Sequence, residues 1–389
     1  AKEQPDLNWE NEVVREKIYE MICWWMDQGL AGFRIDAIMN IKKDLTWSDL
    51  EPDGPDGLAD VYKVTGKVKG IGDFLLEMKH RCFEPYDALT VGEAMFVKEE
   101  ILPQFIGDQG YFSTIFAFEP CHAYRKGKNY MDYDWPQPFD DWKKETFHNQ
   151  KIIEKAGFEA NIIENHDQPR SVSRFGNDSD EYREISAKML ATCIHMMQGT
   201  PYVYQGEELG MTNCPFNTLD NFRDLESINA FHELTEQGKM TEEDMMAAIG
   251  YKGRDNARTP MQWDDSAYAG FSTTNPWIMV NPNYTKINAK DQVNREDSVF
   301  KYYQKLIKLR HESELIVYGT YDLILDDDKD IYAYIRTLGD EKLIVYCNFS
   351  ENTREVELPE EFTNGKVLIS NYIDAKVNHK ITLRPYEAI

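Results

Sequence analysis

Gly32-Phe33-Arg34-Ile35-Asp36-Ala37 alternates apolar and polar residues, the pattern of a short β-strand. A predicted helix from Glu12 to Gln28 precedes it, with Asn11 able to cap its start and Gly29 able to end it. Helix and strand then repeat along the chain, with further strands predicted at residues 88–93, 111–118, 161–165 and 201–205, and further helices at 71–83 and 182–197. This alternation indicates an α/β fold, in which helices wrap a parallel sheet.

The last part of the chain has a different pattern. A polar, irregular excursion at about 206–294 and a predicted helix at 297–311 end the α/β part. Short alternating runs follow, separated by turn residues, at 321–325, 331–335, 343–346 and 366–369. They predict an antiparallel all-β module. Because a single core rarely grows beyond ~250–300 residues, we expect two domains in this 389-residue chain, at residues 1–312 and 313–389.

The chain is strongly acidic. It has 43 basic against 68 acidic residues, which corresponds to a formal net charge of −25. A field of that sign repels nucleic acid and anionic lipid, so we expect neither as a partner. The charge is compatible with a neutral substrate. The 22 tyrosines and 8 tryptophans could stack on sugar rings, but they serve ordinary cores equally well.

The cysteines are scattered, with no CxxC pair and no close Cys/His cluster; they are Cys23, Cys82, Cys121, Cys193, Cys214 and Cys347. This pattern indicates reduced, buried thiols rather than a disulfide frame or a zinc site. No run of ~18 or more apolar residues is present, so no membrane span is expected. We expect a cytoplasmic protein, a monomer or weak oligomer, with no metal site in this segment.

Asp36 ends the first predicted strand. Strand alternation puts Phe33 and Ile35 on one face and Arg34 and Asp36 on the other. The first pair can pack on helices, whereas the second would face a barrel axis near the C-terminal end of the strand, where active sites of such folds lie. An arginine beside the aspartate lowers the pKa of its carboxyl, which suits a nucleophile. An ion pair at a strand end without a catalytic role is the alternative.

Glu93 ends an apolar strand in the run Val91-Gly92-Glu93-Ala94-Met95. Burial beside these apolar neighbours would raise the pKa of its carboxyl, as a general acid working near neutral pH requires. By itself this short run indicates little. The function of Glu93 therefore depends on what the other strands bring to it.

A third strand ends in a run of polar and ionisable residues, Glu164-Asn165-His166-Asp167-Gln168-Pro169-Arg170. Such a run is expensive to bury for packing alone, although a loop tip could also explain it. Asp36, Glu93 and Asp167 each end a different strand, so a barrel would gather them on one rim. A nucleophilic carboxylate, a protonated carboxyl and a third acid are the arrangement that glycoside hydrolysis uses.

These motifs resemble three sequence signatures of the α-amylase superfamily of glycoside hydrolases, at residues 32–36 (GFRID), 91–93 (VGE) and 165–170 (NHDQPR). Longer stretches are similar to its α-glucosidase/oligo-1,6-glucosidase branch, at residues 4–9 (QPDLNW), 200–208 (TPYVYQGEE) and 253–263 (GRDNARTPMQW). The resemblance covers almost the whole chain. Motifs of this length and in this order rarely arise by chance.

The resemblance implies a role for each residue of the site. Asp36 matches the nucleophile that forms a β-glucosyl-enzyme intermediate, Glu93 the acid/base, and Asp167 the carboxylate that holds the sugar hydroxyls. Residues that bind the terminal glucose in the −1 subsite are matched by Arg34, His166 and Arg258. The mechanism would be retaining, with ~5–5.5 Å between the carboxyls of Asp36 and Glu93. No cofactor is implied in this segment.

Ala37 follows the expected nucleophile. In this branch the residue at that place is often Val in α-1,6-preferring enzymes, and Ala or Thr in α-1,4-preferring or broader ones. Alanine leaves less bulk beside the scissile bond. It could equally be a small residue that only fills the barrel, so the linkage preference stays open.

Members of the family begin with three more strand/helix units, an inserted small domain, a metal-site loop and an early motif that supplies an Asp and a His to the −1 subsite. None of these is in the sequence. We expect the C-terminal part of a TIM (β/α)8 barrel, entered at the helix before its fourth strand, followed by the antiparallel β domain. A structural calcium site would belong to the N-terminal part. Because five strands cannot close an eight-stranded barrel, the chain is expected to be a fragment with weak stability and little activity alone.

The expected function is that of a retaining, exo-acting α-glucosidase that removes terminal α-1,6- and/or α-1,4-linked glucose from short oligosaccharides. Sucrose isomerases, trehalose-type hydrolases and glucosyltransferases of the same superfamily share the three acids, and product analysis separates them. A non-catalytic alternative is the heavy-chain relative found with amino-acid transporters, which usually loses the acids and carries a membrane span.

Overall fold

The computed structural model describes residues 5–46, 48–52, 54, 57–59, 68–95, 97–107, 109–122 and 139–389. The chain divides into two compact units, and each is described by itself: Ala1–Glu119 with Ile152–Ala160, and Pro120–Lys151 with Asn161–Ile389. One of the six cysteines predicted to be reduced thiols, Cys121, has a side chain outside the described residues. The five other cysteines are free thiols.

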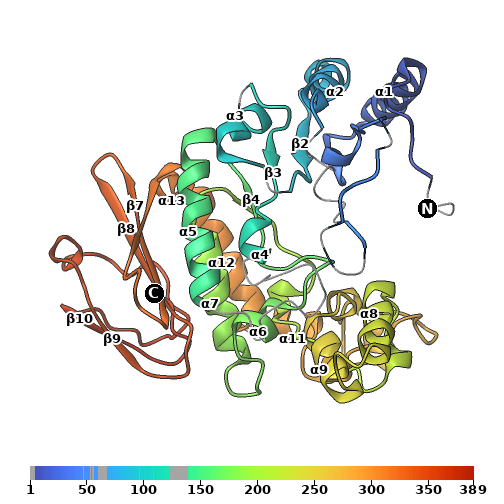
Figure 1. Ribbon diagram of the computed structural model, residues 1–389. Helices are drawn as coiled ribbons and strands as arrows, with labels where there is room; N and C mark the ends of the chain where they lie inside the picture. Colours follow the sequence, from blue (N-terminus) through green and yellow to red (C-terminus); the bar gives the residue numbers. More distant parts are fainter. Residues whose placement is uncertain are drawn as a thin grey trace. The chain divides into compact units, whose positions relative to one another are not determined.

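Figure 1 shows the elements in chain order. The helices are α1 (Glu12–Asp27), α2 (Ile71–Met78), α3 (Leu102–Phe105), α4 (Glu119–His122), α5 (Phe139–Ala156), α6 (Ser171–Phe175), α7 (Arg183–His195), α8 (Leu225–Glu236), α9 (Glu242–Lys252), α10 (Asp255–Arg258), α11 (Ala289–Asn294), α12 (Val299–Glu312) and α13 (Glu314–Tyr318). The strands are β1 (Gly32–Ile35), β2 (Leu89–Gly92), β3 (Thr114–Ile115), β4 (Ala160–Asn161), β5 (Thr200–Pro201), β6 (Thr320–Ile324), β7 (Ile331–Leu338), β8 (Glu341–Asn348), β9 (Arg354–Glu357) and β10 (Lys380–Leu383).

The first unit is built on a parallel sheet of order β1-β2-β3. Phe33 and Ile35 pack against its core, as strand alternation predicts. The approach of β1 to β2 is so close that a Cβ added at Gly32 would lie 1.7 Å from the Leu89 carbonyl oxygen. Glycine is therefore required where this strand begins. The predicted parallel α/β arrangement is confirmed.

Helix α1 begins and ends where the sequence predicts. The Asn11 side chain accepts a hydrogen bond from the Val13 backbone N–H at 3.0 Å, and Gly29 has a φ of 94°. Glycine adopts that left-handed conformation without steric cost, so the helix can stop there. Its inner face buries Tyr19 and Ile22 against the same core, and Met26 is buried as well.

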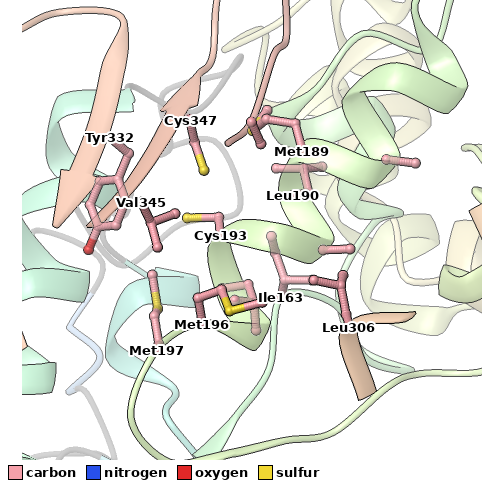
Figure 2. Packing of buried hydrophobic residues seen from close by; sticks show 14 of the residues in the cluster. Ile163, Met189, Leu190, Cys193, Met196, Met197, Leu306, Tyr332, Val345 and Cys347 are labelled. Atoms are coloured by element: carbon pink, nitrogen blue, oxygen red, sulfur yellow. The ribbon is translucent and has the colours of Figure 1, made fainter. Parts of the chain in front are cut away.

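The second unit has a core shared by helices and strands. Figure 2 shows Cys193 of α7 beside Val345 of β8, and Met189 and Leu190 of the same helix belong with Tyr332 of β7 to one buried cluster. Burial of this kind yields about 25 cal/mol per Å² of apolar surface. The helices that precede the C-terminal sheet and the sheet itself therefore stabilise one another.

The C-terminal strands are antiparallel, as predicted, in the order β6-β7-β8, with β9 and β10 as a separate pair. Residues 366–369, expected to form a strand, do not. Val367 and Leu368 are 39% and 45% exposed, and no ladder pairs their backbone, so an apolar run alone was misleading. The strands β9 and β10 stand where the sequence is more polar.

Two buried cations attach loops and helices to this sheet. The Arg336 guanidinium donates hydrogen bonds to the carbonyls of Thr320, Gly319, Ile316 and Met196 at 2.5–2.9 Å. These acceptors come from the start of β6, from α13 and its end, and from the end of α7. Carbonyl dipoles at a helix end favour a positive charge, so this buried arginine is well compensated.

Lys143 of α5 is the second such cation. Its Nζ atom donates to the carbonyls of Leu325, Asp328 and Ile331, all at or before the start of β7. Burial lowers the pKa of this ammonium group, while nearby aspartates act in the opposite direction. Its three N–H bonds are all used, which is the condition for burying an ammonium group at acceptable cost.

The excursion at 206–294 was expected to be irregular, and in this respect the expectation was wrong. It contains α8 and α9, which Figure 1 shows as a helical pair. Their apolar residues form a small core of their own, which includes Phe216, Phe222, Phe231, Leu234, Met245 and Ile249. Asp224 and Thr241 cap the two helices, so turn-forming residues that read as irregular sequence are helix starts.

Candidate active site

In the first unit, one arginine holds two carboxyl groups. The Arg34 guanidinium contacts Asp36 through Nη1 and Glu93 through Nη2, the latter at 2.9 Å. Arg34 comes from β1, Asp36 follows the end of that strand, and Glu93 follows the neighbouring β2. Their proximity therefore results from the parallel pairing of β1 with β2, in which Ile35 lies opposite Gly92.

The two carboxyls have different environments. The Asp36 side chain is 75% exposed, whereas that of Glu93 is 14% exposed. Burial raises the pKa of Glu93 above its usual value, and a hydrogen bond with Asp36 adds to this; the Ala37 N–H and the Arg34 charge act in the opposite direction. This is the raised pKa that the sequence predicts for Glu93. The lowered pKa expected for Asp36 stays a prediction.

The glycine before Glu93 is needed for packing. A Cβ at Gly92 would lie 2.6 Å from the buried ring of Phe112. Real Cβ contacts are not that short, so a larger residue would push the ring or the strand aside. Glycine at position 92 thereby allows β2 to pack closely on Phe112 at the position that precedes Glu93.

Ala37 gives a backbone donor to the same carboxyl. Its N–H lies 2.8 Å from Glu93 Oε2. The residue has φ 43° and ψ 36°, the left-handed conformation that non-glycine residues adopt only at a cost. The chain turns sharply here, immediately after Asp36. No feature of the sequence predicts this turn.

In the second unit, two arginines and a histidine contact Asp167. Arg258 Nη2 lies 2.5 Å from Asp167 Oδ1, and Arg254 Nη1 lies 3.2 Å from the same oxygen. His166 Nε2 lies 3.3 Å from the other oxygen, Oδ2. Arg258 also donates through Nε to the His166 carbonyl at 2.8 Å. The structure therefore brings His166, Asp167 and Arg258 together.

These contacts control the charge of Asp167. Burial by itself raises the pKa of this carboxyl, but His166, Arg254 and Arg258 outweigh it and hold the pKa below its usual value. A carboxylate that stays ionised can accept hydrogen bonds from sugar hydroxyls. Arg254 was not among the predicted site residues. Its spacing of four from Arg258 on one helical turn was the signal available in the sequence.

A buried ion pair lies beneath the Asp167 loop. Arg170 Nη1 contacts Glu164 Oε1 at 2.9 Å, and the exposed fractions of their side chains are 1% and 0%. The Ser171 N–H donates to the other Glu164 oxygen at 2.6 Å. Asn165 accepts from the Asp167 N–H at 2.8 Å and shapes the turn. The polar run of the sequence is therefore partly buried and hydrogen-bonded rather than an exposed loop tip.

Glu207 is a second buried acid close to this pair. Burial raises the pKa of its carboxyl well above the usual value, and the charge of Glu164 adds to that effect. Tyr303 donates its hydroxyl to Glu207 Oε1 at 2.8 Å, and the Tyr204 N–H lies 3.2 Å from Oε2. The Glu207 carboxyl is therefore protonated more readily than an ordinary glutamate.

The predicted site residues fall into two clusters, Arg34, Asp36 and Glu93 in one unit and His166, Asp167 and Arg258 in the other. Nothing in the part of the chain that the structure describes groups three or more His, Cys, Asp or Glu side chains for a metal ion. Within the same residues, no helix combines the length and the apolar character that crossing a bilayer needs.

Comparison with known proteins identifies the family. Residues 1–319 match the model of the alpha amylase catalytic domain, and residues 331–389 match that of the alpha-amylase SusG C-terminal domain. The chain is 46% identical over 403 residues to the oligo-1,6-glucosidase of Parageobacillus thermoglucosidasius, covering all of this chain and 70% of that protein. It is 40% identical over 402 residues to the trehalose-6-phosphate hydrolase of Bacillus subtilis, covering 99% of this chain and 68% of that protein.

The solved structures agree with this relationship. The isomaltulose synthase from Erwinia rhapontici NX5 superposes with a TM-score of 0.92 at 36% sequence identity, covering all of this chain and 69% of that one. The α/β part is thus part of the TIM barrel of an alpha-amylase catalytic domain, and an antiparallel C-terminal domain follows it. The chain belongs to the alpha-amylase family and is a glycoside hydrolase.

Proposed function

We propose that this chain is a retaining, exo-acting α-glucosidase that removes terminal α-1,6- and/or α-1,4-linked glucose from short, uncharged oligosaccharides. The observation that carries the proposal is the unequal pair of carboxyls held by Arg34. Asp36 is exposed beside a guanidinium, as a nucleophile should be, and Glu93 is buried with a raised pKa, as a general acid should be.

In the first step, the Asp36 carboxylate attacks the anomeric carbon, and Glu93 gives its proton to the glycosidic oxygen as that bond breaks. A β-glucosyl ester on Asp36 and a free aglycone result. In the second step, Glu93 removes a proton from water, whose oxygen displaces Asp36 from the anomeric carbon. Two inversions return glucose in the α configuration.

We assign Asp167, with His166, Arg258 and Arg34, to the binding of the terminal glucose. The charges around Asp167 support an uncharged substrate, because the two guanidiniums there are matched by three carboxylates. Besides its contact with Asp167, Arg254 has its Nε atom 3.3 Å from Asp224 Oδ1 and its Nη2 atom 2.6 Å from Glu226 Oε2. In that arrangement no guanidinium is left uncompensated to bind a phosphate group.

The test uses the protein as expressed from its own gene. Isomaltose, isomaltotriose, maltose, sucrose, trehalose and trehalose 6-phosphate are offered separately, and proton NMR follows the first glucose released. We expect hydrolysis of isomaltose or maltose with α-glucose appearing before mutarotation, and no turnover by Asp36→Asn. Initial release of β-glucose would contradict the retaining mechanism.

The other products distinguish the remaining candidates. Isomaltulose or trehalulose formed from sucrose would identify an isomerase, and longer oligosaccharides without free glucose would identify a glucosyltransferase. Turnover confined to trehalose 6-phosphate would contradict the uncharged substrate. We also propose a cytoplasmic location, since the described free thiols suit a reducing compartment.

A further inference from the structure

Arg170 connects three segments of the second unit, and its side chain is almost completely buried. Nη1 donates to Glu164 Oε1 at 2.9 Å and to the Gln205 carbonyl at 2.8 Å. Nη2 donates to the Ala257 carbonyl at 3.4 Å. One guanidinium thereby joins the residues before the Asp167 loop, the segment after β5 and helix α10.

The Ala257 carbonyl accepts two side-chain hydrogen bonds. The Tyr204 hydroxyl donates to it at 3.0 Å, alongside Arg170, whose guanidinium lies over the Tyr204 ring at 5.2 Å from the ring centroid. Ala257 directly precedes Arg258, which contacts Asp167 at 2.5 Å. Any displacement of this carbonyl therefore moves the Arg258 backbone relative to the Asp167 carboxylate.

We propose that Arg170 and Tyr204 are positioning residues for glucose binding: by holding the Ala257 carbonyl, they set the distance between Arg258 and Asp167. The inference rests on the proposed function of Arg258 and Asp167. Neither Arg170 nor Tyr204 takes part in bond making or proton transfer. They act through α10.

A stabilising role alone does not account for this arrangement. A buried ion pair adds little to stability compared with apolar residues of the same size, since desolvation cancels most of the attraction. The contacts of Arg170 are instead directional, because the N–H groups of a planar guanidinium point in fixed directions, whereas an ammonium group is a compact charge on a flexible stem. Geometry of this kind matters for turnover, since small misplacements of binding groups cost large factors in rate.

Tyr204→Phe is the decisive variant, because it removes one hydrogen bond to Ala257 and leaves the ion pair intact. We expect kcat/KM for the preferred disaccharide to fall about ten-fold, the effect of one well-placed hydrogen bond. Arg170→Lys should cost about 100-fold through the same displacement. If that variant fails to fold, the tyrosine variant alone decides.

Tyr334→Phe is the matched control, since its buried hydroxyl also donates to a backbone carbonyl, that of Cys193, at 2.6 Å. It should lower the melting temperature as Tyr204→Phe does and leave kcat/KM unchanged. Adding Tyr204→Phe to Arg258→Lys should cost little beyond Arg258→Lys alone, because both act through one contact.

Equal losses of kcat/KM in the two phenylalanine variants, or fully multiplicative losses in the double variant, would refute the positioning role. A wild-type protein that hydrolyses no α-glucoside would instead refute the proposed function. The two failures are therefore distinguishable.

Discussion

The backbone N–H of Ala37 donates a hydrogen bond of 2.8 Å to Glu93 Oε2, from a residue in the left-handed conformation. Ala37, which follows the proposed nucleophile Asp36, thereby holds the carboxyl of the proposed general acid Glu93 in place. The strained backbone of Ala37 therefore helps to orient the Glu93 carboxyl.

Ala37→Gly should raise the free energy of unfolding by about 1 kcal/mol, because glycine adopts a φ of 43° without a Cβ penalty. Ala37→Val should lower it, since a β-branched residue fits that conformation poorly. Ala31→Gly, six residues earlier, is the control and should bring no gain, because Ala31 is not among the residues with a positive φ. The same Ala37→Val variant, assayed with isomaltose and maltose, tests linkage: an unchanged preference would exclude a role for this position.

Glu93→Gln should lower kcat by about 10²–10⁴-fold with natural disaccharides, the usual contribution of a general acid. The decrease in kcat should be much smaller with 4-nitrophenyl α-glucoside, because its leaving group departs without being protonated. In the wild type, the raised pKa of Glu93 keeps its carboxyl protonated to a higher pH than an ordinary glutamate, and activity should fall as the pH rises through that pKa. A variant with the same alkaline limb as the wild type would contradict the assignment of the acid.

Arg258→Met should lower kcat/KM by about 100-fold, as expected when one partner of a hydrogen-bonded charge pair is removed. The pKa of Asp167 is held low by Arg258 and its neighbours, so removing Arg258 raises it. The acid limb of the pH profile should therefore move to higher pH. Arg295→Met, which breaks an ion pair with Glu184, is the control and should leave the profile in place.

Glu207→Gln should stabilise the protein at pH 8 and have little effect at pH 4. The pKa of Glu207 is raised in the folded state, so the folded protein binds this proton more tightly than the unfolded chain. Its contribution to stability is present below the unfolded pKa and is lost as pH rises towards the folded one. Melting temperatures measured across this range test the prediction.

Glu164→Gln is the informative comparison, because Glu164 is also buried but is paired with Arg170. Removing its charge leaves a buried guanidinium uncompensated and should cost about 3–5 kcal/mol. Stabilisation at pH 8 by Glu164→Gln, with destabilisation by Glu207→Gln, would show that the raised pKa is assigned to the wrong glutamate.

Much of the fold could be predicted, because local signals and long-range packing agree there. Asn11 and Gly29 delimit α1 as a cap and a stop should, and the alternation of Phe33 and Ile35 gives the buried face of β1. The strand expected at 366–369 fails for the opposite reason. Its apolar run has no ladder partner, whereas β9, with one buried side chain at Val356, pairs with β10.

For the candidate site, the sequence predicts which residues to expect. It does not predict which of them contact one another. Asp36, Glu93 and Asp167 are predicted from their places at strand ends, and their catalytic roles stay predictions. Arg254 was within a recognised motif, but its contact with Asp167 depends on how α10 lies against the Asp167 loop. The hydrogen bond from Ala37 depends on a backbone turn that no residue type signals.

The four carbonyls around Arg336 limit which C-terminal domains could replace the present one. They belong to α7, α13 and β6, whereas the cation that satisfies them belongs to β7. Exchange of the C-terminal domain between relatives would leave the Met196 carbonyl without its donor unless the incoming strand carried an equivalent cation. A C-terminal domain from a relative could therefore replace this one without loss of that hydrogen bond only if its strand supplied a cation at the place of Arg336.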